Sequence, residues 1–86
     1  MNPLIVKRNN SLELYNPQKI KRVVMAAGLS EEMATSLVST IEKWLRSLKT
    51  EQLSSITLRD EVLNELKKVS TTAANLFAWY QKTKET

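Results

Sequence analysis

The residues best suited to chemistry are basic side chains gathered near the amino end of the chain. Residues 1–29 carry five of them against a single acid, Glu13, a local charge of +4. The five are Lys7, Arg8, Lys19, Lys21 and Arg22. Residues 30–86 carry eight basic and eight acidic side chains, which cancel. Such a concentrated positive field attracts a small polyanion or a nucleic-acid backbone, although a solubilising surface has the same composition.

Residue types that many enzymes depend on are missing. The chain has no cysteine and no histidine, which excludes disulfides, thiolate nucleophiles, zinc fingers and histidine-based acid–base catalysis. A metal site of Asp and Glu alone stays open, but the acidic residues occur singly or as neighbours such as Asp60 and Glu61, which point in different directions on a helix. An enzyme is therefore the class of function that the sequence supports least.

A helix start that favours anions follows the first basic residues. Asn16 is expected to cap this helix and Pro17 to occupy its first position, where a missing N–H costs nothing. We expect the free N–H groups and positive dipole end of the helix, together with Lys19, to form an anion site. A capped amphipathic helix with a solvated basic face gives the same pattern. Gly28, the only glycine, should end the helix.

Two short strands are predicted before this helix, within a hairpin over residues 4–15. A three-residue loop, 8–10, would place the apolar side chains on one face of the hairpin. In that register Val6 lies opposite Leu12 and Leu4 opposite Leu14, on the face away from Ile5, Lys7, Ser11 and Glu13. Because an isolated hairpin is not stable, we expect the apolar face to pack on the rest of the protein.

Apolar residues at helical spacing predict four helices, over residues 17–27, 31–49, 56–69 and 72–83. Ser30 and Ser55 are the expected caps of the second and third helices, and 50–54 is predicted to be a polar connection. The expected core comprises Ile20, Val23, Val24, Ala27, Met33, Leu37, Ile41, Trp44, Leu45, Leu48, Leu58, Val62, Leu66, Val69, Ala73, Phe77 and Tyr80. The aromatic residues are assigned to this core in preference to base stacking.

The fold class predicted from these elements is mainly α with a small β-hairpin, in one domain over residues 1–86. No apolar run approaches the roughly 18 residues that a membrane span needs, and the first residues have no signal-peptide pattern. We therefore expect a cytoplasmic protein without a membrane partner.

The order of these motifs resembles the ATP-cone, a regulatory domain found in many ribonucleotide reductases and in the zinc-ribbon repressor of their genes. Nearly the whole chain is covered by the resemblance. The residues that carry it are Ile5-Val6-Lys7-Arg8, Asn9-Asn10, Glu13, Asn16, Lys19-Ile20, Arg22, Gly28-Leu29-Ser30, Ser55, Leu58, Val62, Leu66, Ala73, Phe77 and Tyr80. Asn10 stands where the family usually has glycine, and the zinc cysteines of the repressor are absent, which argues against that repressor.

The resemblance implies a four-helix bundle capped by the N-terminal hairpin, with ATP or dATP, and Mg²⁺, held between them. Its site residues, carried over by position, are Lys7, Arg8 and Lys19 for the phosphates, Glu13 and Asn16 for the base or ribose, Ile5 and Ile20 for the adenine, and Arg22, Ser55 and Arg59. It also implies a regulated partner or parent chain related to ribonucleotide reductase, and it allows self-association.

Two other classes of function fit the same residues. A small basic helical domain could bind nucleic acid, although its basic residues form one cluster and not a stripe, so nucleic acid is the less expected partner. A helical bundle could also serve only as a protein-interaction domain, with the hairpin as its docking edge. A nucleotide-binding regulatory module is the leading hypothesis.

Overall fold

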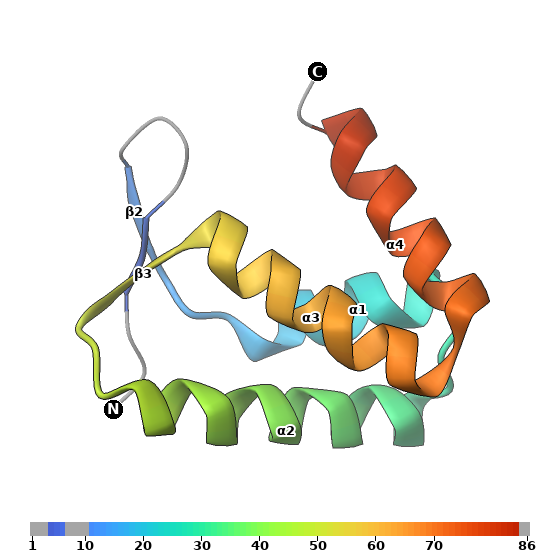
Figure 1. Ribbon diagram of the computed structural model, residues 1–86, viewed down its shortest axis with the longest axis horizontal. Coiled ribbons are helices and arrows are strands. Elements are labelled where there is room, and N and C mark those ends of the chain that lie inside the picture. The colour runs from blue at the N-terminus through green and yellow to red at the C-terminus, as the bar shows by residue number, and fades with distance from the viewer. Residues whose placement is uncertain (1–3, 7–10, 85–86) are drawn as a thin grey trace.

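The computed structural model describes residues 4–6 and 11–84, and within these the side chains of residue 5 and residues 11–79. Its strands are β1 (Leu4–Val6), β2 (Leu12–Leu14) and β3 (Gln52–Ser54), and its helices are α1 (Pro17–Ala26), α2 (Glu31–Leu48), α3 (Ser55–Val69) and α4 (Thr71–Lys84). Figure 1 shows the strands together at one end of the helices. The predicted fold class, mainly helical with short strands near the amino end, is confirmed.

The strands form one sheet in the order β2-β1-β3. β1 and β2 are antiparallel in the predicted register, with Leu4 opposite Leu14, Ile5 opposite Glu13 and Val6 opposite Leu12. The third strand was not predicted, since residues 50–54 were expected to be a plain connection. β3 runs parallel to β1 and pairs Ile5 with Leu53. The hairpin is therefore part of a three-stranded sheet with β1 at its centre, and the third strand leads directly into α3.

The predicted orientation of the hairpin is wrong. Ile5 is buried, with 3% of its surface exposed, whereas Leu12 and Leu14 are 53% and 76% exposed. The reason is β3: it places Leu53 beside Ile5, and both pack into the core. A strand contributed from far along the chain thus decides which face of the sheet is covered.

Local capping rules account for the ends of the helices. Asn16 caps α1 with Pro17 in its first turn, Ser30 caps α2, and Gly28 follows α1 with a φ of 117°, a conformation that glycine adopts without strain. The cap of α3 is Ser54, one residue before the predicted Ser55. The Ser70 hydroxyl accepts the Ala73 N–H at 3.2 Å, which starts α4 directly after α3.

The core lies where α1 and α3 pack on α2 and where α4 packs on α3 and α1. Its buried residues include Val24 of α1, Ile41 and Leu45 of α2, and Leu66 of α3. Several predicted core residues are at least 39% exposed instead, namely Met33, Leu48 and Val69. Of the aromatic residues, Phe77 is buried, Trp44 is partly buried, and Trp79 is 60% exposed. The side chain of Tyr80 lies outside the described residues. The exceptions stand at helix ends or on outer faces, where no neighbouring helix covers them.

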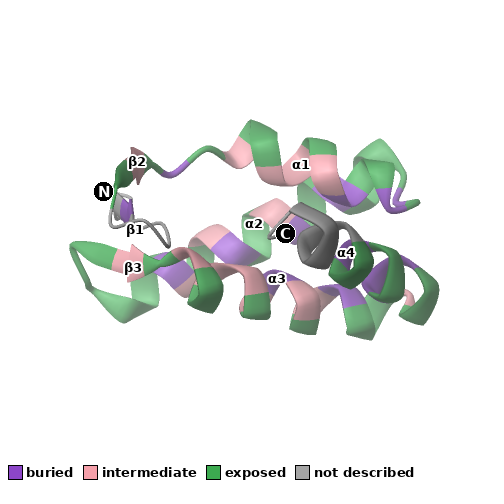
Figure 2. Cartoon of the chain, turned by 90° about the horizontal axis from the view of Figure 1, so that it is seen from above, coloured by how far each residue is buried: buried purple, intermediate pink, exposed green. Residues whose placement is uncertain are grey.

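The helices place two amino ends beside the sheet. α1 and α3 both lie along α2 and run opposite to it, on separate sides of the molecule, so both begin at the end that carries the strands (Figures 1 and 2). In the described part of the chain, no helix combines the length and apolar character needed to cross a membrane.

Candidate functional site

The sheet brings Glu13 and Lys19 together at the start of α1. The Lys19 ammonium nitrogen lies 3.6 Å from a Glu13 carboxylate oxygen, with side-chain exposures of 53% and 35%. These two predicted site residues come from different elements, β2 and α1, and Asn16 lies between them in the chain. The arrangement offers an ammonium donor and a carboxylate acceptor at an accessible helix start.

The backbone N–H groups at this helix start are not free, contrary to expectation. The Asn16 side-chain oxygen accepts the N–H groups of Gln18 and Lys19, at 3.1 and 3.3 Å, and Pro17 has none. The Ile20 N–H donates to the Asn16 carbonyl. An anion at this end would therefore interact with the Lys19 ammonium and the helix dipole, and not with unpaired N–H groups.

The two apolar residues assigned to the adenine pack into the protein. Ile5 is buried in the core, and Ile20 is half-buried and packs against it. Arg22 is exposed on α1, one turn beyond Lys19. Ile5 and Ile20 thus contribute to the core, while Lys19 and Arg22 present charge to solvent.

The third helix reaches the same end of the molecule through β3. Ser54 pairs with Val6, so Ser55, the first residue of α3, begins beside β1. Arg59 lies one turn further along α3, and both side chains are partly exposed. The predicted residues Lys7 and Arg8 lie outside the described residues, so their contacts with a triphosphate stay a prediction.

Lys21 does not join the other basic residues. Its ammonium lies 3.5 Å from a carboxylate oxygen of Glu31, at the start of α2. Because Glu31 belongs to the electrically neutral part of the sequence, the charge pattern gave no sign of this pair. The basic cluster predicted from the sequence is therefore smaller than its composition suggested.

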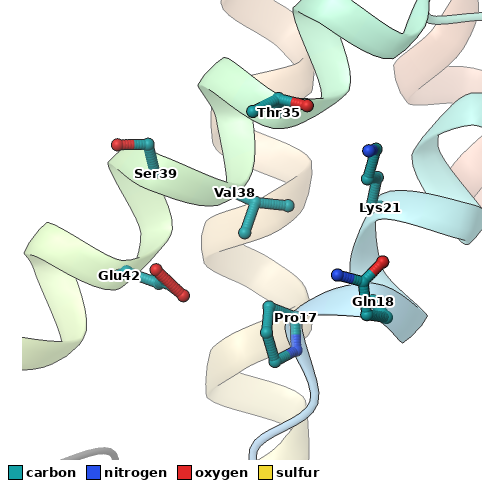
Figure 3. A pocket seen from close by; sticks show the side chains of 7 residues that line it. All are labelled: Pro17, Gln18, Lys21, Thr35, Val38, Ser39 and Glu42. Carbon is teal, nitrogen blue, oxygen red and sulfur yellow. The ribbon is translucent and has the colours of Figure 1, made fainter.

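Sequence reasoning also missed a cleft between α1 and α2. Its volume is about 300 Å³, and its walls are Pro17, Gln18 and Lys21 on α1 and Thr35, Val38, Ser39 and Glu42 on α2 (Figure 3). The only sequence signal was spacing, since 35, 38, 39 and 42 share one side of a helix. That spacing marks a helix face without indicating that it borders a cleft.

Tyr15, between β2 and α1, lies close to this cleft. The residue is 8% exposed and its hydroxyl oxygen, fully buried, has no hydrogen-bond partner among the described residues. Burial, followed by the negative charge of nearby Glu42, raises the pKa of Tyr15 to about 12. The hydroxyl has no partner at hydrogen-bonding geometry among the described residues, so Glu42 acts on it as a neighbouring charge.

Metal ligands do not gather in the part of the chain that the structure describes: no group of three or more acidic side chains is placed to hold an ion there. The start of α1 and the turn after it offer an ammonium donor from Lys19, a guanidinium donor from Arg22 and a carboxylate acceptor from Glu13.

Comparison with known proteins gives the family. The transcriptional repressor NrdR of Psychrobacter sp. (strain PRwf-1) is 35% identical over 82 residues, which cover 88% of this chain and 52% of the repressor. The chain thus spans about half the length of that relative. The model of the ATP cone domain matches residues 3–84, nearly the whole sequence. The chain belongs to the ATP-cone domain family.

Proposed function

We propose that this chain binds ATP or dATP at the end formed by the sheet and the start of α1, and that binding regulates a ribonucleotide reductase or a related partner. ATP-cone domains are regulatory domains that bind adenine nucleotides. The observation that carries the proposal is the pairing of Glu13 with Lys19 beside the Asn16 cap, in a chain that matches this family over residues 3–84.

Each described residue has a role consistent with its chemistry. Lys19, 53% exposed, would bind a phosphate as a point charge and give up its pairing with Glu13. The Glu13 carboxylate would then accept a hydrogen bond from a ribose hydroxyl or the adenine amino group. Lys7 and Arg8 would add charge on the phosphates, Ser55 and Arg59 would approach from α3, and Mg²⁺ would bind phosphate oxygens.

Regulation requires that the nucleotide bind one arrangement of the domain more tightly than another. The connections of the sheet favour this: β2 leads into α1, and β3 leads into α3. A ligand that draws Lys19 away from Glu13 acts on the β2–α1 junction, and the paired strands link that junction to α3. The partner would respond to the altered positions of α1 and α3.

A calorimetric titration with ATP, dATP and GTP, each with and without Mg²⁺, tests the proposal. We expect saturable binding of the adenine nucleotides and weak binding of GTP. At a hundredfold excess over its dissociation constant, the ligand should add about 2.7 kcal/mol of stability and raise the melting temperature by roughly ten degrees or more. Equal binding of all three nucleotides would indicate generic attraction to phosphate, and no binding would overturn the proposal.

Nucleic-acid binding is the second candidate, favoured because the NrdR relative is named as a transcriptional repressor. The net charge of +4 is compatible with it. This candidate predicts DNA affinity that falls steeply with salt concentration and does not depend on adenine nucleotides. Fluorescence anisotropy with a labelled duplex at several salt concentrations separates it from the nucleotide proposal.

A further inference from the structure

The cleft between α1 and α2 holds a carboxylate whose charge is not balanced inside the cleft. One of its seven lining residues is basic, Lys21, and one is acidic, Glu42. Lys21 is already paired with Glu31 at 3.5 Å. The molecule carries a net charge of +4, and the two lining charges are equal in number, but Glu31 outside the cleft engages Lys21 and leaves the Glu42 carboxylate without an ion pair among the described residues. A polyanion is therefore disfavoured there, and a cation is favoured.

Helix geometry concentrates that negative charge at one end of the cleft. Glu31 and Glu42 are eleven residues apart on α2, which corresponds to about 16 Å of helix. Because Lys21 is paired with Glu31, its positive charge offsets the negative charge at the Glu31 end of the cleft, away from Glu42. Figure 3 shows Glu42 on the α2 side of the cleft, toward the Pro17 end and away from Lys21. Glu42 is partly buried, and none of the described residues forms an ion pair with it.

A second observation points to the same end of the cleft. The Tyr15 hydroxyl is buried without a hydrogen-bond partner in the described part of the structure, and its electrostatic neighbour is Glu42. The Tyr15 hydroxyl is thus a buried polar group without a partner, and it lies near Glu42, which has no ion pair among the described residues. A cationic ligand that donates hydrogen bonds to the Glu42 carboxylate would balance its charge, and the Tyr15 hydroxyl would be left to donate to the same carboxylate.

The remaining walls favour a planar cation on an aliphatic stem. Pro17 and Val38 offer apolar surface, whereas the Gln18 amide and the Ser39 hydroxyl offer oxygen acceptors. A guanidinium has five N–H donors in a plane, which match a carboxylate in bidentate fashion and leave donors for further acceptors. The volume of about 300 Å³ lies at the small end of the range for ligand sites.

We propose that the α1–α2 cleft binds one alkyl-guanidinium group, with Glu42 as its counter-ion. The group is the side chain of an arginine in a partner polypeptide or a free guanidino compound, since both present the same chemistry. The site is separate from the proposed nucleotide end, and it requires no nucleotide.

NMR titration of the ¹⁵N-labelled 86-residue chain tests this site. The ligands are N-acetyl-arginine-methylamide, agmatine, and N-acetyl-citrulline-methylamide as the neutral counterpart of the first. We expect both guanidinium ligands to shift the amide signals of Gln18, Lys21, Ser39 and Glu42 saturably, and citrulline to have no such effect. Tighter binding of the capped arginine assigns the site to a partner polypeptide, and tighter binding of agmatine assigns it to a free compound.

Matched variants decide whether Glu42 is responsible. Glu42→Gln should weaken guanidinium binding at least about tenfold, whereas Glu32→Gln, an exposed α2 carboxylate that does not line the cleft, should leave it unchanged. Ser39→Leu, which fills the cleft and keeps Glu42, should also abolish binding, and it serves as the test if Glu42→Gln fails to fold. Dissociation constants weaker than about 10 mM, equal binding of citrulline, or unchanged affinity in Glu42→Gln or folded Ser39→Leu would overturn the proposal.

Discussion

Two sides of the same short helix have opposite electrostatic surroundings. On one side of α1, Lys19 lies beside the sheet with Glu13 as the nearby acid, and Arg22 is exposed one turn further along the helix. On the other side, Lys21 faces α2 and is paired with Glu31, while Glu42 remains without an ion pair among the described residues. A helix of ten residues thus separates a cationic surface from an anionic cleft.

The difference shows that the position of a charge on the helix matters more than its place in the sequence. Lys19, Lys21 and Arg22 are near neighbours in the chain, and composition alone assigns them to one cluster. The helical period turns Lys21 away from the other two. The cationic side depends on the sheet, because β2 supplies Glu13, whereas the cleft depends on two helices. Variants that affect only the sheet or only the cleft therefore test whether the two sides of α1 are independent.

The largest effect is expected from the buried face of the sheet. Ile5→Ala should lower the free energy of unfolding by about 2 to 5 kcal/mol, because it leaves a cavity in the core. Leu14→Ala, in the paired strand but 76% exposed, should cost less than about 0.5 kcal/mol. Urea denaturation of both variants measures the difference. Similar losses would show that both faces of the sheet are covered in solution.

Tyr15 gives a pH test of the cleft side. Burial raises its pKa from an ordinary value of 10.0 to about 12, so the folded state keeps the phenol neutral after the unfolded chain has ionised. The stabilisation is complete below pH 10 and is lost as the pH rises to 12, and it amounts to about 2 to 3 kcal/mol. Tyr15→Phe has no phenol to ionise, so it should not lose this stability between pH 10 and pH 12. We expect the unfolding free energy of the wild type to fall relative to that of Tyr15→Phe across this interval.

If the unfolding free energies of the wild type and Tyr15→Phe fell in parallel between pH 10 and pH 12, the Tyr15 hydroxyl would be exposed to water. Glu42→Gln provides the finer control, because removal of the nearby negative charge should lower the pKa of Tyr15 while burial still holds it above the ordinary value. The phenolate absorbance during an alkaline titration measures that pKa directly.

Lys19→Ala tests the cationic side. If Lys19 binds a phosphate, the affinity for ATP should fall roughly ten- to a hundredfold, and guanidinium binding in the cleft should be unchanged. The fold should persist, since exposed ion pairs contribute only about 0 to 1 kcal/mol. Lys67→Ala, an exposed lysine in the last turn of α3, is the matched control for loss of one positive charge. Equal losses in the two variants would mean that ATP responds only to overall charge.

Local features of this fold were accessible from the sequence because they depend on neighbouring residues. Asn16, Ser30 and Gly28 act within a few residues of their own position, so capping rules identified them correctly. The hairpin register followed from loop length and side-chain alternation. These rules fix where elements begin and how adjacent strands pair.

Features that depend on distant residues were not accessible. β3 contains one apolar residue, Leu53, and its pairing with Ile5 joins positions 48 residues apart, so no local pattern reveals it. Because the pairing with Leu53 was not foreseen, the sequence predicted that the face with Leu12 and Leu14 would be buried. The pairing of Lys21 with Glu31 likewise depends on how α1 packs against α2. Packing between elements therefore set both the covered face of the sheet and the charge of the cleft.

The smallest expected effect concerns the residue that both sides of α1 share. Asn16→Ala removes the acceptor for the Gln18 and Lys19 N–H groups and should cost about 1 kcal/mol of stability. Because Gln18 lines the cleft and Lys19 lies on the cationic side, fraying of this turn should weaken ATP and guanidinium binding together, each measured by titration.

Ser30→Ala is the matched control, since the Ser30 hydroxyl caps α2 by accepting the Met33 N–H at 3.2 Å and its loss should cost a similar amount. Ser30 lies at the end of α2 that is remote from the sheet (Figure 1). If Ser30→Ala weakens ATP binding as much as Asn16→Ala does, the effect arises from global stability. If only Asn16→Ala weakens both ligands, the first turn of α1 is the structural link between the two sides.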